Sequence, residues 1–168
     1  MDQLTEILRR LHDAKVEYSL IGGYASRHYG VTLVTEDVDV CARFSPENLR
    51  RIESAVKDLH PRHRLTANRL PLELTDRLCA ELKNMYLTTD LGILDCLSEV
   101  AGVGDFQKVL AESELMSFPF GSCHVLKIDA LIRAKQAVGR PHDLITVRQL
   151  TAIKERTESL RKKSITES

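Results

Sequence analysis

Residues 19–44, SLIGGYASRHYGVTLVTEDVDVCARF, decide the fold. Asp37 and Asp39 stand inside a run that is otherwise typical of a β-strand, although Asp is among the residues least suited to strands. An apolar strand that ends at Ile21 breaks just before them, at the pair Gly22 and Gly23. The segment therefore predicts a strand, a glycine turn, a short helix and a second strand that carries two acids.

The spacing of the two acids suggests why they are there. Residues two apart on a strand point to the same face, so Asp37 and Asp39 project side by side while Val38 and Val40 point to the core. Neighbouring carboxylates disfavour each other's ionisation, and a bound divalent cation relieves that cost. Mg²⁺ prefers a few carboxylates together with water and phosphate oxygens. The alternative is that both acids lie on a solvated outer face of the strand.

The glycine pair fits a phosphate site at the start of the short helix. Free backbone N–H groups and the helix dipole favour an anion there. The segment is not a P-loop, because no Gly-Lys-Ser/Thr follows, and it lacks the G-x-G-x-x-G dinucleotide pattern. The alternative is a plain turn that needs the flexibility of glycine at Gly22 and Gly23.

A third acid is expected from the stretch GILDCL, residues 92–97. Asp95 lies there in an apolar strand, where an unpaired carboxylate would be costly. We therefore expect Asp95 to be paired, hydrogen-bonded or bound to metal. The competing candidate, Asp90, lies in a predicted turn, where Asp is common for local reasons.

The remaining pattern predicts a small α/β or α+β domain. Helical periodicity covers residues 2–14, 45–59 and the region from 127 onward, with a break at 139–141. Strands are expected at 16–21 and 37–42, as a hairpin over 84–97, and as two short strands that turn near Gly121. Residues 60–73 have no clear pattern beyond a turn, and 161–168 are polar and expected to fray. The prediction is one domain over residues 1–168: a helix-covered mixed sheet in 1–126, followed by C-terminal helices in 127–168.

Composition limits the partners. The 24 basic and 24 acidic residues cancel, so no overall field draws the chain to nucleic acid or to a membrane, although a local basic patch is not excluded. No apolar run approaches the ~20 residues of a membrane span, and the first ten residues form an amphipathic helix rather than a signal peptide. Four cysteines without C-x-x-C spacing are expected to be reduced core residues, which favours a cytoplasmic location.

Taken together, these motifs resemble the nucleotidyltransferase superfamily of the DNA polymerase beta type. Its hallmark is an apolar residue with Gly-Gly or Gly-Ser, a short helix, D-x-D/E on the next strand, and a third acid on a later strand. Here Ile21-Gly22-Gly23, Asp37-Val38-Asp39 and Asp95 match it. The stretch LIRAKQAVGRPHDLITVRQL, residues 131–150, is similar to the Lys-x4-Arg-x-x-Asp-Leu segment of the bacterial branch that includes abortive-infection toxins. The resemblance covers about residues 16–150.

The resemblance implies a metal-dependent enzyme that transfers a nucleoside monophosphate from a triphosphate such as ATP to a hydroxyl group. Asp37, Asp39 and Asp95 would be catalytic and would bind two Mg²⁺ ions, with Mn²⁺ as a substitute. Gly22 and Gly23 would contact phosphate oxygens.

Lys135 and Arg140 are the further nucleotide-binding candidates implied by the resemblance. Lys135 lies on the apolar stripe of its helix, so its amine either reaches phosphate in a cleft or extends to water. Arg140 either binds phosphate or pairs with Asp143, and Asp143 also suits the first turn of a helix.

The acceptor stays open between tRNA, a small molecule such as an antibiotic, and a protein hydroxyl. The alternative function is a nucleotide-binding or partner-binding module without turnover, such as one member of a toxin–antitoxin pair. A protein partner or a homodimer is compatible with either function.

Overall fold

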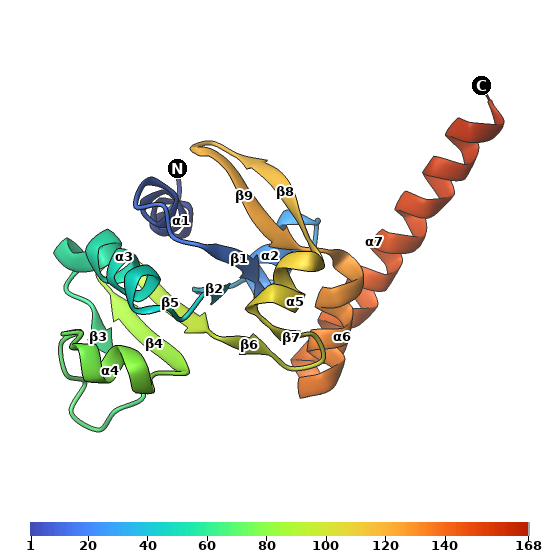
Figure 1. The fold of residues 1–168 in the computed structure, drawn as a ribbon. Helices are drawn as coiled ribbons and strands as arrows, with labels where there is room; N and C mark the ends of the chain where they lie inside the picture. The colour runs from blue at the N-terminus through green and yellow to red at the C-terminus, as the bar shows by residue number, and fades with distance from the viewer. Residues whose placement is uncertain (168) are drawn as a thin grey trace.

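A mixed β-sheet of seven strands forms the centre of the protein in a computed structural model, which describes residues 1–167 (Figure 1). The strand order is β3-β4-β5-β2-β1-β9-β8, with β2–β5 and β1–β9 parallel and the other pairs antiparallel. The strands are β1 (Tyr18–Ile21), β2 (Asp37–Ala42), β3 (Arg62–His63), β4 (Asn84–Thr89), β5 (Gly92–Leu97), β8 (Ser113–Phe118) and β9 (Gly121–Leu126). A small second sheet pairs β6 (Glu99–Val100) with β7 (Gly104–Asp105).

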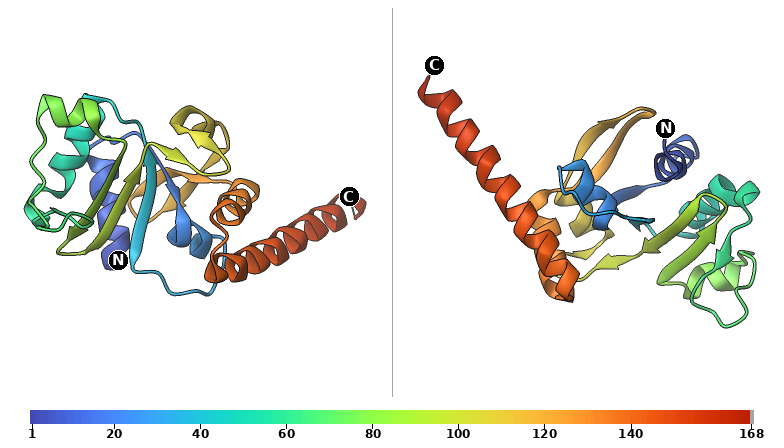
Figure 2. Two further views of the ribbon diagram at one scale, coloured as in Figure 1. Left: turned by 90° about the horizontal axis from the view of Figure 1, so that it is seen from below. Right: turned by 180° about the vertical axis from the view of Figure 1, so that it is seen from behind.

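Helices lie on both sides of the sheet and extend beyond one end of it (Figures 1 and 2). They are α1 (Gln3–Asp13), α2 (Gly22–His28), α3 (Pro46–Val56) with the 3-10 turn η1 (Lys57–Leu59), α4 (Asp76–Glu81), α5 (Phe106–Ala111), α6 (Ile128–Val138) and α7 (Pro141–Thr166). The predicted fold class, a helix-covered mixed sheet with helices at the C-terminus, is confirmed.

Local sequence signals account for where several helices begin and where one of them ends. The Asp2 carboxylate accepts a hydrogen bond from the Thr5 backbone N–H at 2.7 Å and caps α1. Ser45 caps α3, and Pro46 occupies its first position. Gly139, with a φ of 69°, ends α6 in the left-handed conformation that favours glycine.

The main core lies between α1, α3 and one face of the sheet. Val38, Val40 and Leu94 are fully buried on this face, together with the apolar face of α1. The carboxylates of β2 and β5 point to the other face, as alternation along a strand requires. Strand register therefore separates the core from the site described below.

The four cysteines are buried free thiols: Cys41, Cys79, Cys96 and Cys123. This agrees with the expectation of reduced core residues. Within residues 1–167, none of the helices combines the length and the apolar character that crossing a bilayer would take.

The C-terminal region differs from the prediction. Residues 161–166, expected to fray, continue α7 as regular helix to Thr166, while Ser168 lies outside the described residues. Leu150 is the last fully buried residue of α7, and the later turns project away from the sheet in every view (Figures 1 and 2). Lys, Arg and Glu dominate these turns and have a high intrinsic preference for helix, which an argument from apolar periodicity alone misses.

Candidate active site

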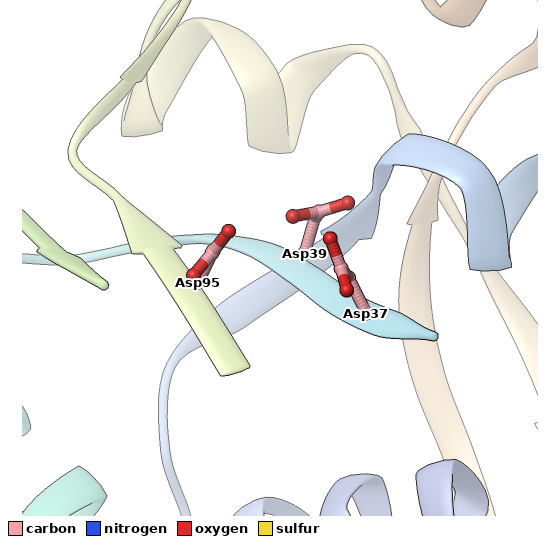
Figure 3. A group of neighbouring side chains, drawn as sticks. All are labelled: Asp37, Asp39 and Asp95. Atoms are coloured by element: carbon pink, nitrogen blue, oxygen red, sulfur yellow. The ribbon is translucent and has the colours of Figure 1, made fainter. Parts of the chain in front are cut away.

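Three carboxylates meet on the open face of the sheet. Asp37 and Asp39 project from β2, and Asp95 projects from the neighbouring strand β5 (Figure 3). The parallel register places Asp39 directly beside Asp95. One ligand oxygen from each residue lies within 4.8 Å of the others, which makes this group a candidate metal site. The structure thus brings together the three acids that the sequence singled out from segments more than fifty residues apart.

The electrostatics of the cluster favour a cation. Burial, followed by the charges of Asp95 and Asp37, raises the pKa of Asp39 from 3.8 to about 6, and the opposing effect of Lys135 and Arg64 is smaller. Burial also raises the pKa of Asp95, although Arg64 counteracts it. The Asp95 Oδ1 atom is buried and has no hydrogen-bond partner among residues 1–167. An unpartnered, buried carboxylate oxygen is costly unless a ligand completes it.

Arg64 is the site residue that the sequence did not reveal. Its Nη2 donates to the Asp95 Oδ2 at 2.5 Å, and Asp95 itself is only 7% exposed. The backbone N–H of Arg64 donates to the Tyr86 carbonyl at 2.8 Å, which carries the β3–β4 pairing one residue further. Arg64 belongs to the stretch 60–73 whose pattern was undefined, so only the strand register shows that it faces Asp95. The competing acid, Asp90, instead contacts the His60 Nδ1 at 2.6 Å.

The glycine pair lies against the acid cluster, and its two members differ. Gly22 has a φ of 72°, and a β-carbon there would lie 2.9 Å from the β-carbon of Asp39. Gly23 lies outside the positive-φ region, and its added β-carbon would meet the Thr35 hydroxyl oxygen at 3.2 Å. The requirement for glycine, assigned above to the pair, therefore falls mainly on Gly22. Helix α2 starts here, and Ile21 provides no side-chain cap for it.

Lys135 and Arg140 converge on Asp143 beside the cluster. Asp143 is fully buried and accepts hydrogen bonds from the Arg140 Nε at 2.8 Å and from the Arg140 backbone N–H at 3.2 Å. The Lys135 Nζ lies 3.5 Å from Asp143, and the Lys135 side chain is only 17% exposed. Burial alone would raise the pKa of Asp143, but Arg140 and Lys135 outweigh it and lower that pKa. Lys135 is thus turned into the site rather than toward water, and Arg140 pairs with Asp143.

Two hollows meet at Asp39. One of about 440 Å³ is lined by Gly23, Asp37, Asp39, Lys135 and Arg140, together with the loop 31–36. The other, of about 230 Å³, shares Asp39, Lys135 and Arg140 with the first and adds Gly22 and an apolar wall from β5, β6 and α6. A larger hollow of about 640 Å³, between α3 and β3, contains none of the predicted site residues. The hollows at Asp39 have a volume and chemistry suited to part of a nucleotide.

Comparisons with known proteins support the fold. No protein-family model and no curated protein sequence matches the chain. Among solved structures, the crystal structure of ANT(2")-Ia in complex with adenylyl-2"-tobramycin is similar, with 19% identity, a TM-score of 0.56 and coverage of 98% of both chains. The lincosamide antibiotic adenylyltransferase LnuA, bound to lincomycin, is similar over 90% of this chain and 96% of its own, with 15% identity and a TM-score of 0.62. At these identities the likeness establishes the fold.

Proposed function

Because the chain has the nucleotidyltransferase fold, we propose that it is an enzyme that transfers a nucleoside monophosphate from a nucleoside triphosphate to a hydroxyl group, with Mg²⁺ as cofactor. The observation that carries this proposal is the convergence of Asp37, Asp39 and Asp95 at one point of the sheet. The glycine turn and Lys135 lie beside that point.

The ligand atoms of the three acids suit Mg²⁺. They are carboxylate oxygens alone, and because burial and the neighbouring acids raise the pKa of Asp39, a bound cation would favour its ionised form. Asp37 and Asp39 would hold one ion, and Asp95, through its unpartnered Oδ1, would help to hold a second. Bound Mg²⁺ would neutralise the triphosphate and stabilise charge on the entering and leaving oxygens, and Mn²⁺ would accept the same oxygen ligands.

The part of the site that would bind the nucleoside triphosphate is formed by Gly22, Gly23, Lys135 and Arg140. Because Gly22 has no side chain, a phosphate group can approach the start of α2 closely, where backbone N–H groups would donate to its oxygens. Lys135 would place its positive charge beside the same phosphates. Arg140, whose side chain is 58% exposed, would keep its bond to Asp143 and direct its remaining N–H groups to the nucleotide.

Asp95 would act as the general base. It would accept the proton of the acceptor hydroxyl as the oxygen of that group forms a bond to the α-phosphorus. The bond from the α-phosphorus to the oxygen that bridges to the β-phosphate would break, and pyrophosphate would leave. A raised pKa makes a carboxylate a stronger base, and burial raises that of Asp95.

The solved structures suggest the donor nucleotide. One neighbour holds an adenylylated product, and the other is described as an adenylyltransferase, so ATP is the donor that we propose for this chain. A second function, a nucleotide-binding module without turnover, is favoured by the Arg64–Asp95 ion pair, which neutralises the third acid. Membership of a toxin–antitoxin pair and a cytoplasmic location remain predictions from the sequence.

The decisive experiment compares label transfer and nucleotide binding in wild type and Asp95→Asn. The protein is incubated with Mg²⁺, α-labelled ATP and fractionated cell extract, and ATP binding is titrated separately. Turnover should fall at least ~10²-fold in Asp95→Asn, the scale of a lost general base, with nearly unchanged affinity for ATP. Asp90→Asn is the matched control and should transfer label at the wild-type rate.

Two outcomes would contradict parts of this proposal, the first the role of Asp95 and the second the turnover itself. Equal transfer by wild type and Asp95→Asn would remove Asp95 from the reaction. Tight Mg²⁺-dependent binding of ATP by the wild type without transfer to any fraction would favour the module without turnover.

A further inference from the structure

The half of the sheet that carries Asp95 has an open face that the transfer chemistry above does not use. Strand register places Tyr86 beside Asp95, Thr88 beside Ile93, and Arg62 beside Thr88. These side chains are half-buried or exposed, whereas those that alternate with them on the other face, such as Leu87 and Leu94, are completely buried. We call the open set the platform; it consists of Arg62, Arg64, Tyr86, Thr88 and Ile93.

The platform offers a ring next to the general base. Tyr86 is half-buried and is the direct cross-strand partner of Asp95. The Arg64 guanidinium lies over the Tyr86 ring, 5.7 Å from its centre, so that one face of the ring is covered by a guanidinium plane. An aromatic ring and a guanidinium plane on the exposed face of a sheet are the surfaces on which unpaired nucleic-acid bases stack.

The segment 60–72, which pairs with the strand of Tyr86, is rich in basic residues, whereas Asp95 lies on the other side of Tyr86. Residues 60–72 contain His60, Arg62, His63, Arg64 and Arg69 and no acid, although the whole chain is neutral. Arg62 is exposed and forms no ion pair with any residue from 1 to 167; its Nη1 donates only to the Arg69 carbonyl, at 3.1 Å.

Arg64 also has unused donors. Only its Nη2 binds Asp95, and its Nε is buried without a hydrogen-bond partner within the described chain. A guanidinium has five donors, so Arg64 can hold Asp95 and an anionic oxygen at the same time. Because that Nε is buried, the groups open to an acceptor are the Arg64 Nη1, which forms no hydrogen bond with residues 1–167, and the exposed guanidinium of Arg62; both favour an acceptor that carries anionic oxygens.

We propose that the acceptor is a single-stranded nucleic acid whose end lies on the platform, an inference that rests on the proposed nucleotidyl transfer. A base stacks on Tyr86, phosphates pair with Arg62 and Arg64, and the terminal hydroxyl reaches Asp95. A polycationic acceptor would instead meet the like charges of the platform. The donor nucleotide binds on the opposite side of the acids, at Gly22 and Lys135, so the two substrates do not compete for the same groups.

The test is fluorescence anisotropy of labelled single-stranded RNA and DNA, about 12 nucleotides long, titrated with the full chain and Mg²⁺ without ATP. Tyr86→Leu should weaken binding about 5- to 150-fold, the range for one lost stacking contact, and Tyr86→Phe, which keeps the ring, should not. Arg62→Gln should reduce the slope of log K against log salt by about 0.7, the value for one phosphate contact to a single strand. Arg77→Gln on α4, with its side chain 87% exposed, removes the same charge elsewhere and should change neither quantity.

Binding of either strand with these variant effects supports the inference, and a preference for RNA would indicate that the 2′-hydroxyl is contacted. The inference is overturned if neither strand binds at up to ~10⁻⁴ M protein, the weak end of non-specific affinity, while ATP still binds with Mg²⁺. It is also overturned if Tyr86→Leu and Arg62→Gln both bind like the wild type. Absence of Mg²⁺-dependent ATP binding in the wild type would instead contradict the proposed function.

Discussion

Asp39→Asn should stabilise the protein when no metal is present. Asp39 is held against Asp37 and Asp95, and burial together with these charges raises its pKa from 3.8 to about 6. This difference corresponds to at most about 3 kcal/mol of unfolding free energy that the wild type loses when Asp39 is ionised. Asparagine has nearly the same shape and no charge, so the variant should regain most of that energy.

The sign of the effect sets its pH dependence. Below about pH 4 the carboxyl is protonated in both the folded and the unfolded chain, so wild type and variant should unfold at similar free energy. Between about pH 4 and pH 6 the unfolded chain ionises first, and the wild type loses stability as the pH rises. Above about pH 6 the full difference should remain.

Thermal and urea unfolding in EDTA from about pH 4 to pH 8 measure this difference. For a chain of this size, 3 kcal/mol corresponds to a rise in Tm of about 6–12 °C. Asp13→Asn is the control, because Asp13 lies at the exposed end of α1 and a solvent-exposed ion pair such as the one it forms with Arg9 contributes little to stability.

Addition of Mg²⁺ and ATP should reverse the order of stability. The wild type should gain about 4.1 kcal/mol at a thousandfold excess of ligand over Kd, which exceeds the difference of about 3 kcal/mol, and Asp39→Asn should gain far less. Equal stability of the two proteins in EDTA at pH 8 would refute the like-charge cluster. Equal stabilisation of both by Mg²⁺ and ATP would refute the metal site.

Two further predictions test the neighbours of the cluster. Gly22→Ala should cost at least about 2 kcal/mol of unfolding free energy and abolish ATP binding, because it combines a φ of 72° with a clash against Asp39. Gly23→Ala should cost less. Unfolding and ATP titration that reverse this order would contradict the assignment. Asp143→Ala should cost about 1–3 kcal/mol at pH 7, because the hydrogen bond from the Arg140 Nε is lost and the Lys135 amine, on a side chain only 17% exposed, loses its neighbouring carboxylate. Because the pKa of Asp143 is lowered, its contribution to stability should be present above about pH 4 and lost as the pH falls further. A difference in unfolding free energy between wild type and variant that widens in acid would contradict this expectation.

The sequence predicts those parts of the candidate site that depend on local pattern. The alternation of acids and valines in residues 37–42 matches the bounds of β2, and the cost of an isolated acid in an apolar strand singled out Asp95. Arg64 could not be predicted, because the register between β3 and β4 determines which residue of 60–73 faces Asp95, and no periodic pattern in the sequence encodes that register.

Contacts between distant segments also explain the other differences. The positive φ lies at Gly22 rather than Gly23 at a position where Gly22 meets Asp39, a residue of a different strand. Residues 155–166 of α7 are exposed, so apolar periodicity gives no signal for them, and the helix continues there through the intrinsic preference of its residues.

The parallel pairing of β2 with β5 has an evolutionary consequence. Between these adjacent strands the chain makes an excursion through residues 43–91, which supplies Arg62, Arg64 and Tyr86. The groups assigned to the triphosphate come from outside it, at Gly22, Gly23 and residues 135–140. In the proposed reaction, the two reactants would therefore be bound by separate lengths of polypeptide, which meet at the ladder that holds Asp39 beside Asp95. Exchange of residues 43–91 between homologous chains would change the acceptor of the proposed transfer and leave the groups assigned to the triphosphate in place.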